Sequence, residues 1–120
     1  MGTLERYDAR IAMLQDLRRD GGGTYHNGDL SPFTPSAGYA VAIDGVCLNE
    51  SEITSDILGY LAFAVADEHD TEYVGTWIDG GVVYIDAVRH IRNRDAAITI
   101  GKEHDQKAIW DFAAGESVTL

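Results

Sequence analysis

The sequence predicts an α+β fold: a single compact domain whose largely antiparallel sheet surrounds a central hairpin and is packed by two or three helices. Residues 73–89 contain two runs of β-branched and aromatic side chains separated by Asp79-Gly80-Gly81, a hairpin turn signal. Periodic segments follow in the order α-β-α-β-β-α-β-β, which favours antiparallel pairing. A chain of 120 residues can bury roughly two-thirds of its unfolded surface in one core.

The two strands of the central hairpin have mixed faces. Tyr73, Gly75 and Trp77 alternate on one side of the first strand, and Tyr84 and Asp86 share one side of the second. Because neither side is fully polar, we expect the hairpin in the middle of the sheet, with helices on at least one face. We predict Trp77 or Tyr84 in the core, so that truncating Trp77 to alanine would cost about 3–5 kcal/mol of stability.

The N-terminal segment is predicted to form a helix over residues 4–20, with Thr3 as its N-cap and a glycine run from Gly21 at its end. Its apolar stripe is narrow and nearly heptad-spaced. The helix could therefore pack on the domain's own core or pair with a second copy in a homodimer. The stripe consists of Leu4, Tyr7, Ile11, Leu14 and Leu17.

Residues 21–36 are predicted to form a polar loop rich in glycine and proline, outside the α+β core of residues 37–120. Part of this loop combines a phenol, an imidazole and a carboxylate, which are groups that a small polar ligand site or active site would use. The candidate residues are Tyr25, His26 and Asp29, bordered by Tyr39 and Trp77. A turn at Asn27-Gly28 explains the same residues without chemistry.

The next segment is predicted as a short hairpin, a helix and a connector. Residues 39–43 alternate like a strand, Asp44-Gly45 forms a turn, and residues 46–48 pair back. Asn49 with Glu52 resembles a capping box that starts a helix running to about residue 66. Residues 67–72 then form an acidic connector into the central hairpin.

The C-terminal part is predicted as one helix and a closing hairpin. Asn93 or Asp95 starts the helix, residues 107–112 alternate like a strand, and residues 113–115 turn the chain into a last strand over residues 116–120.

The charge of the chain is concentrated in its middle. The net charge is −11, yet the four acids and four arginines of residues 1–20 cancel, as do the five acids and five bases of residues 89–120. Residues 21–88 contain eleven acids and no Lys or Arg. We expect one connected negative surface formed by Asp44, Glu50, Glu52, Asp56, Asp67, Glu68, Asp70 and Glu72.

Such a surface repels nucleic acid and anionic lipid and favours a basic protein surface as partner. The other reading is that the acidity serves solubility alone. No apolar run approaches the ~20 residues of a membrane span, and the N-terminus lacks the features of a secretory leader. The single Cys47 fits a reducing cytoplasm.

Catalytic and metal chemistry have little support in the sequence. The four histidines lack the close spacing of a zinc site, and residues 67–72 lack the spacing of a calcium loop. Cys47 lies between apolar neighbours, and no serine has a nucleophile motif around it. We therefore expect no metal, no cofactor and no catalytic residue.

Four segments carry a resemblance: Gly75-Thr-Trp-Ile-Asp79, Val83-Tyr-Ile-Asp86, Arg94-Asp-Ala-Ala97 and Asp105-Gln-Lys-Ala-Ile-Trp-Asp111. Together they resemble a pattern in small uncharacterised proteins of actinobacteria and their phages and plasmids. No activity accompanies that resemblance, so no functional residue is carried over. In such a setting, the first hypothesis is an inhibitor whose acidic middle docks on a nucleic-acid-binding protein. The alternatives are a small enzyme or ligand-binding module using residues 25–29, and an accessory domain without autonomous activity.

Overall fold

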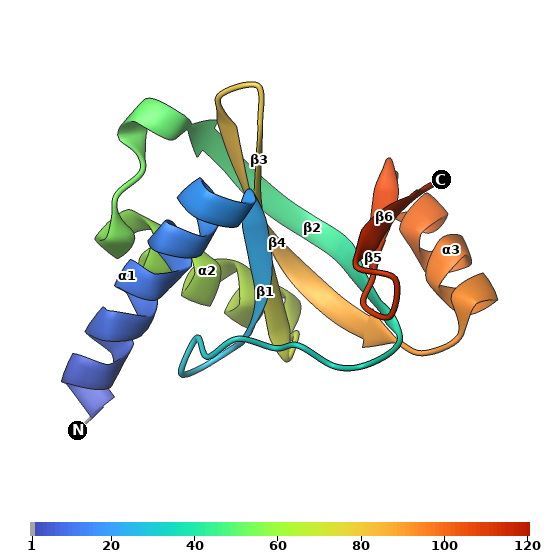
Figure 1. The fold of residues 1–120 in the computed structure, drawn as a ribbon, viewed down its shortest axis with the longest axis horizontal. Coiled ribbons are helices and arrows are strands. Elements are labelled where there is room, and N and C mark those ends of the chain that lie inside the picture. Colours follow the sequence, from blue (N-terminus) through green and yellow to red (C-terminus); the bar gives the residue numbers. More distant parts are fainter. Residues whose placement is uncertain (1) are drawn as a thin grey trace.

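A six-stranded antiparallel sheet runs through the molecule, in the order β1-β3-β4-β2-β5-β6 (Figure 1). The computed structural model describes residues 2–120, with side chains from residue 8 onward. Within that range the elements are α1 (Gly2–Asp20), β1 (Gly22–His26), β2 (Tyr39–Asn49), the 3₁₀ turn η1 (Glu50–Glu52), α2 (Ser55–His69), β3 (Tyr73–Asp79), β4 (Val82–Ile91), α3 (Arg94–Glu103), β5 (Ala108–Asp111) and β6 (Glu116–Thr119). The predicted α+β class is confirmed.

The predicted central hairpin is β3–β4, and it lies in the middle of the sheet as expected. Trp77 faces Tyr84 across the pair, and β1 and β2 flank the hairpin on its two sides. The turn uses Gly80 and Gly81 with φ of 57° and 79°, a left-handed conformation that favours glycine.

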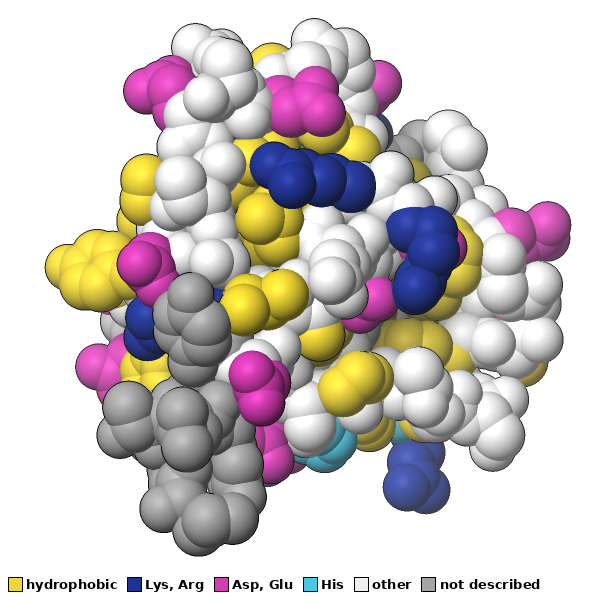
Figure 2. All heavy atoms as spheres, turned by 60° about the vertical axis from the view of Figure 1, so that its left-hand side comes forward, with side chains coloured by type: hydrophobic (Ala, Val, Ile, Leu, Met, Phe, Trp, Pro, Cys, Tyr) yellow, Lys and Arg dark blue, Asp and Glu magenta, His cyan; other side chains and the backbone are white. Residues whose placement is uncertain are grey.

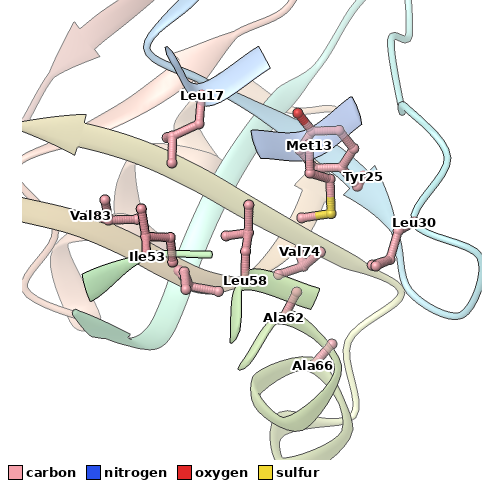
Figure 3. Packing of buried hydrophobic residues seen from close by; sticks show 11 residues of the cluster. Met13, Leu17, Tyr25, Leu30, Ile53, Leu58, Ala62, Ala66, Val74 and Val83 are labelled. Carbon is pink, nitrogen blue, oxygen red and sulfur yellow. The ribbon is translucent and has the colours of Figure 1, made fainter. Parts of the chain in front are cut away.

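Helices cover one face of the sheet. Residues opposite each other on antiparallel strands project to the same side, so Val74, Val83 and Ile85 alternate onto one face. These side chains form a cluster with Met13 and Leu17 of α1 and with Leu58 and Ala62 of α2 (Figure 3). A second cluster places α3 on the same face at the other end of the sheet, through Val41, Ala97 and Ile109.

The N-terminal helix packs on the domain's own core, which was one of its two expected roles. Met13 and Leu17 are buried, and Gly21 donates its backbone N–H to the Leu17 carbonyl at 3.1 Å. The Thr3 cap and the apolar positions Leu4 and Tyr7 lie outside the described side chains. No helix within residues 2–120 combines the length and apolarity that crossing a membrane requires.

The prediction of a structureless loop over residues 21–36 was wrong at its start, because residues 22–26 form the edge strand β1. Their glycines suggested a loop, but here they allow close pairing: a Cβ at Gly22 would collide with the Thr76 carbonyl oxygen of β3. The predicted turn after it is present, with Gly28 at φ 107°. Phe33 then donates its N–H to the Thr24 carbonyl at 2.8 Å.

The predicted short hairpin at Asp44-Gly45 was also wrong. The chain continues as one long strand, β2, which pairs with β4 along its length and has a bulge between Ala42 and Asp44. Gly45 fits this path because a Cβ there would collide with the Asp86 side chain on the neighbouring strand. Gly45, which indicates a turn when only the sequence is considered, therefore allows close packing between two strands.

The second helix begins later and ends later than predicted. Asn49 donates its amide N–H to Glu52 at 3.0 Å and does not cap a helix, whereas the Thr54 hydroxyl caps α2 by accepting from the Ile57 N–H at 3.2 Å. Helix α2 continues through His69, so residues 67–69 belong to its last turn. In the C-terminal part, Asn93 caps α3 and β5–β6 form the expected closing hairpin.

The prediction of Trp77 in the core was wrong, since Trp77 is 44% exposed. Tyr84 is only partly buried. Both residues lie on the face of the sheet opposite the helices, because both alternate with the buried positions Val74, Val83 and Ile85.

Candidate binding site

The sheet face opposite the helices is the most distinctive surface of the described chain, and we call it the open face. Three neighbouring strands form its centre, and their register sets its members. They are Gly75 and Trp77 of β3, Tyr84, Asp86 and Val88 of β4, and Gly45 and Cys47 of β2. Aromatic, acidic and glycine residues therefore alternate with the apolar core residues of the same strands.

Trp77 and Tyr84 form a stacked aromatic pair on this face. Their ring centroids lie 4.4 Å apart with planes 16° from parallel, and nearly half of the Trp77 surface is accessible to solvent. Opposite positions on antiparallel strands bring the two rings together. An exposed indole face attracts a cation such as a guanidinium or ammonium group.

Asp86 lies in the middle of this surface, on a central strand. Its two cross-strand neighbours are Gly75 and Gly45, neither of which has a side chain to cover it. The Trp77 side chain, a hydrogen-bond donor, lowers the pKa of this carboxyl group. None of the ion pairs between described residues includes Asp86. The carboxylate is therefore partly buried and has no basic partner among the side chains of residues 8–120.

This environment changes the acidity of Asp86. Burial raises the pKa of its carboxyl group from 3.8 to about 6, the Trp77 hydrogen bond opposes that change, and the charge of Asp44 adds to it. At neutral pH the carboxylate is charged in a place that disfavours charge. A carboxylate held in this way destabilises the fold, and such groups concentrate at functional sites.

The end of the sheet nearer the 27–38 loop is covered by an aromatic cluster. Phe33 stacks on Tyr73 with centroids 4.0 Å apart, and it contacts His90 and Phe112 edge-on at 5.1 and 5.6 Å. The His90 ring nitrogen Nε2 lies 2.9 Å from the Ala37 carbonyl oxygen, which holds the loop against the sheet. On the three central strands, the accessible part of the open face is therefore the region around Trp77, Tyr84 and Asp86.

The predicted ligand loop is divided between two sides of the sheet. Tyr25 is 1% exposed and donates its hydroxyl hydrogen to Asp16 at 2.8 Å, and burial raises its pKa far above the usual range. Its neighbour His26 points to the other face and contacts Phe33. Asp29 accepts hydrogen bonds from the Ser31 backbone and hydroxyl, which lower its pKa and hold a turn.

Tyr39 lies farther away, against the second core cluster, where its hydroxyl accepts from Arg94 at 3.3 Å. Of the five ligand-loop residues, Trp77 is the one that belongs to the accessible part of the open face. The geometry therefore does not gather them into one site.

The eight predicted acidic residues are all exposed, but they lie in several places. Asp56 in the first turn of α2 and Asp67 near its end are separated by about 16 Å along the helix axis. Asp56 lies 3.8 Å from Arg10, and Asp44 lies 3.4 Å from His69. On the face drawn in Figure 2, acidic and basic side chains are interspersed.

The other predicted acidic residues are also spread over separate parts of the surface. Glu50 and Glu52 lie in η1, next to the hairpin tip, where the Glu50 N–H bonds the Gly81 carbonyl. Glu68 lies exposed in the last turn of α2, and Asp70 and Glu72 border a shallow hollow that also contains Arg89 and His90.

Sequence reasoning did not select Asp86 as a site residue. Its signal was present, because an acid in the middle of an apolar central strand is unusual and alternation placed it beside Tyr84. Gly75 belongs to the same hairpin as Asp86, but Gly45 comes from β2, which is distant in the sequence, so only the register shows that glycines flank this carboxylate on both sides. No family model, curated protein or solved structure matches this chain.

Proposed function

We propose that this chain is a non-enzymatic interaction protein that binds a basic protein surface, and that Trp77, Tyr84 and Asp86 on the open face form its contact. One observation carries the proposal: a partly buried carboxylate that has no basic partner among the described residues lies beside an exposed, stacked indole. A Lys or Arg side chain would satisfy both groups, by pairing with the carboxylate and by lying on the aromatic face.

The charge of the whole chain supports the same class of partner. A net charge of −11 on 120 residues attracts basic surfaces over about a Debye length, roughly 8 Å at physiological ionic strength, and repels nucleic acid. Long-range attraction accelerates encounter, while the aromatic and carboxylate groups supply the specific contact. In a phage or plasmid setting, a nucleic-acid-binding protein of the host would offer such a basic surface.

The stability cost of Asp86 supports a binding role as well. An asparagine of the same shape would accept the Trp77 hydrogen bond without a buried charge. Retaining the charged group is reasonable where a partner supplies the opposite charge, because binding then removes the penalty.

A random-peptide library tests the proposal without knowledge of the natural partner. We expect selection on the wild-type protein at low salt to enrich peptides rich in Lys and Arg, whose affinity falls steeply as salt rises. Asp86→Asn and Trp77→Ala should each weaken the binding of these peptides about tenfold.

Asp79→Asn is the matched control, because it removes the same charge from an exposed position at the tip of the same hairpin. It should weaken binding by less than about threefold, the effect of a screened exposed charge. Enriched peptides without basic residues, or equal losses for Asp86→Asn and Asp79→Asn, would overturn the proposal.

A further inference from the structure

Most of strand β2 has a free edge. It pairs with β4 along its whole length on one side, but on the other side β5 pairs only with Tyr39 and Ala40 (Figure 1). Among the described residues, the one backbone group of residues 41–48 with a partner outside the β2–β4 pair is the Gly45 N–H, which donates to the neighbouring Asp44 carboxylate at 2.8 Å. Residues 41–49 therefore form an open edge, and Val46 on it is 40% exposed.

The opposite edge of the sheet, strand β1, is not free. The chain folds back over β1, where Tyr25 bridges Pro32 and Phe33 bonds Thr24, so that edge is covered by its own loop. A free edge is a template on which another extended chain can add by backbone hydrogen bonds. Gly45 belongs to this open edge and lies opposite Asp86 on β4. The open edge thus lies beside a carboxylate that has no basic partner among the described residues.

We propose that the open edge binds an extended segment of the basic partner, which adds to the sheet beside β2 and places a Lys or Arg opposite Gly45, where its charged group reaches the Asp86 carboxylate. This inference rests on the proposed function, because it assumes a basic partner. It adds the mode of recognition: backbone pairing for register and one cation for specificity.

The local geometry would allow a Lys or Arg side chain on the added strand to reach the Asp86 carboxylate. The Asp86 oxygen Oδ1 lies where a Cβ of residue 45 would be, so the carboxylate leans over Gly45 toward the free edge. The added strand would lie about 4.8 Å from β2, a gap that the three or four methylenes of an Arg or Lys stem can span. Trp77 holds the same carboxylate from the β3 side. Any residue larger than glycine at position 45 would block this path.

The charge of the edge favours a basic segment over a second copy of this chain. Asp44 and Glu50 are exposed at and beside the open edge, and each copy has a net charge of −11. Pairing two copies would bring like charges together, whereas a basic strand brings opposite ones.

Backbone methylation of the tightest peptide from the library selection tests this mode. A peptide in an added strand points alternate N–H groups toward β2 and the others toward solvent. We expect N-methylation of one alternate set to weaken binding about tenfold or more, because bonds to β2 are lost, and N-methylation of the other set to change it less than about threefold. Hydrogen exchange of residues 41–49 should slow on binding.

A double-mutant cycle tests the cation. Replacing one basic residue of the peptide by norleucine should weaken binding to the wild type about tenfold and leave binding to Asp86→Asn nearly unchanged. If basic peptides bind and need Asp86 but tolerate both methylation sets equally, strand addition is wrong while the proposed function stands.

Two other results decide the remaining cases. If no basic peptide is enriched, the proposed function and this inference both fail. If the protein alone sediments as a dimer with residues 41–49 already protected from exchange, a second copy occupies the edge, and the inference is overturned.

Discussion

The two faces of the central hairpin come from the same strands, yet they differ in almost every physical respect. On the helix-covered face, Val83, Ile85 and Ala87 of β4 are fully buried. On the open face, their immediate neighbours Tyr84 and Asp86 are only partly buried and Trp77 of β3 is exposed. The first face holds the fold together by apolar burial. The second contributes less to stability, which leaves its residues available for binding.

The largest expected effect lies on the covered face. Ile85→Ala removes a fully buried side chain between α2 and the sheet, and we expect a loss of about 2–5 kcal/mol in the free energy of unfolding, measured by urea denaturation. Binding to a basic peptide should be unchanged at temperatures where the variant is folded. A loss below about 1 kcal/mol would show that the covered face is not the stabilising one.

The next largest expected effect is a gain in the free energy of unfolding, not a loss. We expect Asp86→Asn to stabilise the protein by about 1–3 kcal/mol at pH 7.5, because it removes a charge from a partly buried site. The folded-state pKa of about 6 lies above the unfolded value of 3.8, so the wild type loses stability as pH rises between these values. The advantage of the variant should therefore vanish below about pH 4 and be complete above about pH 7.

The relevant charged and polar neighbours in that experiment are Asp44 on β2 and Trp77 on β3. Asp79→Asn serves as the control, because it removes the same charge from an exposed position of the same hairpin. Equal pH profiles for wild type and Asp86→Asn would contradict the raised pKa.

A smaller effect is expected for Trp77→Ala, about 1–2 kcal/mol, because the ring is nearly half exposed and loses mainly its stacking on Tyr84. Trp77→Phe sharpens the comparison: it keeps an aromatic ring but removes the N–H that bonds Asp86. The pKa of Asp86, followed by NMR, should rise further in that variant, since a bond to the charged form is lost. A loss above about 3 kcal/mol for Trp77→Ala would place the ring in the core.

The smallest effect concerns a polar group on the covered face. Tyr25→Phe removes the hydroxyl that bonds Asp16 of α1 at 2.8 Å and leaves the buried ring in place. We expect a loss of about 0.5–1.5 kcal/mol, the usual net value of one hydrogen bond. Asp16→Asn is the companion variant, and its combination with Tyr25→Phe should cost less than the sum of the two. A strictly additive result would show that the bond contributes nothing.

The local sequence pattern was enough to predict several helices and strands of this protein. The hairpin was evident from β-branched strands around Gly80-Gly81, and α3 from its Asn93 cap. Helix α1 followed from its spacing and the glycine run after it. These features depend on residues that are close in the sequence, so turn chemistry, capping and periodicity determine them. The α+β class followed from their order.

Tertiary structure decided the rest. The glycines of β1 and β2 indicate turns when read locally, but Gly22 and Gly45 allow close approach to Thr76 and Asp86 on neighbouring strands. The alternation of side chains along β3 predicts that Trp77 lies on the same side of the sheet as Tyr73 and Gly75. It does not predict which side of the sheet the helices cover. The candidate site depends on both facts. Asp86 is partly buried and has no basic partner among the described residues, and Gly45 from the distant strand β2 meets it opposite Gly75 of its own hairpin on the uncovered face. Only strand register and helix packing bring that about.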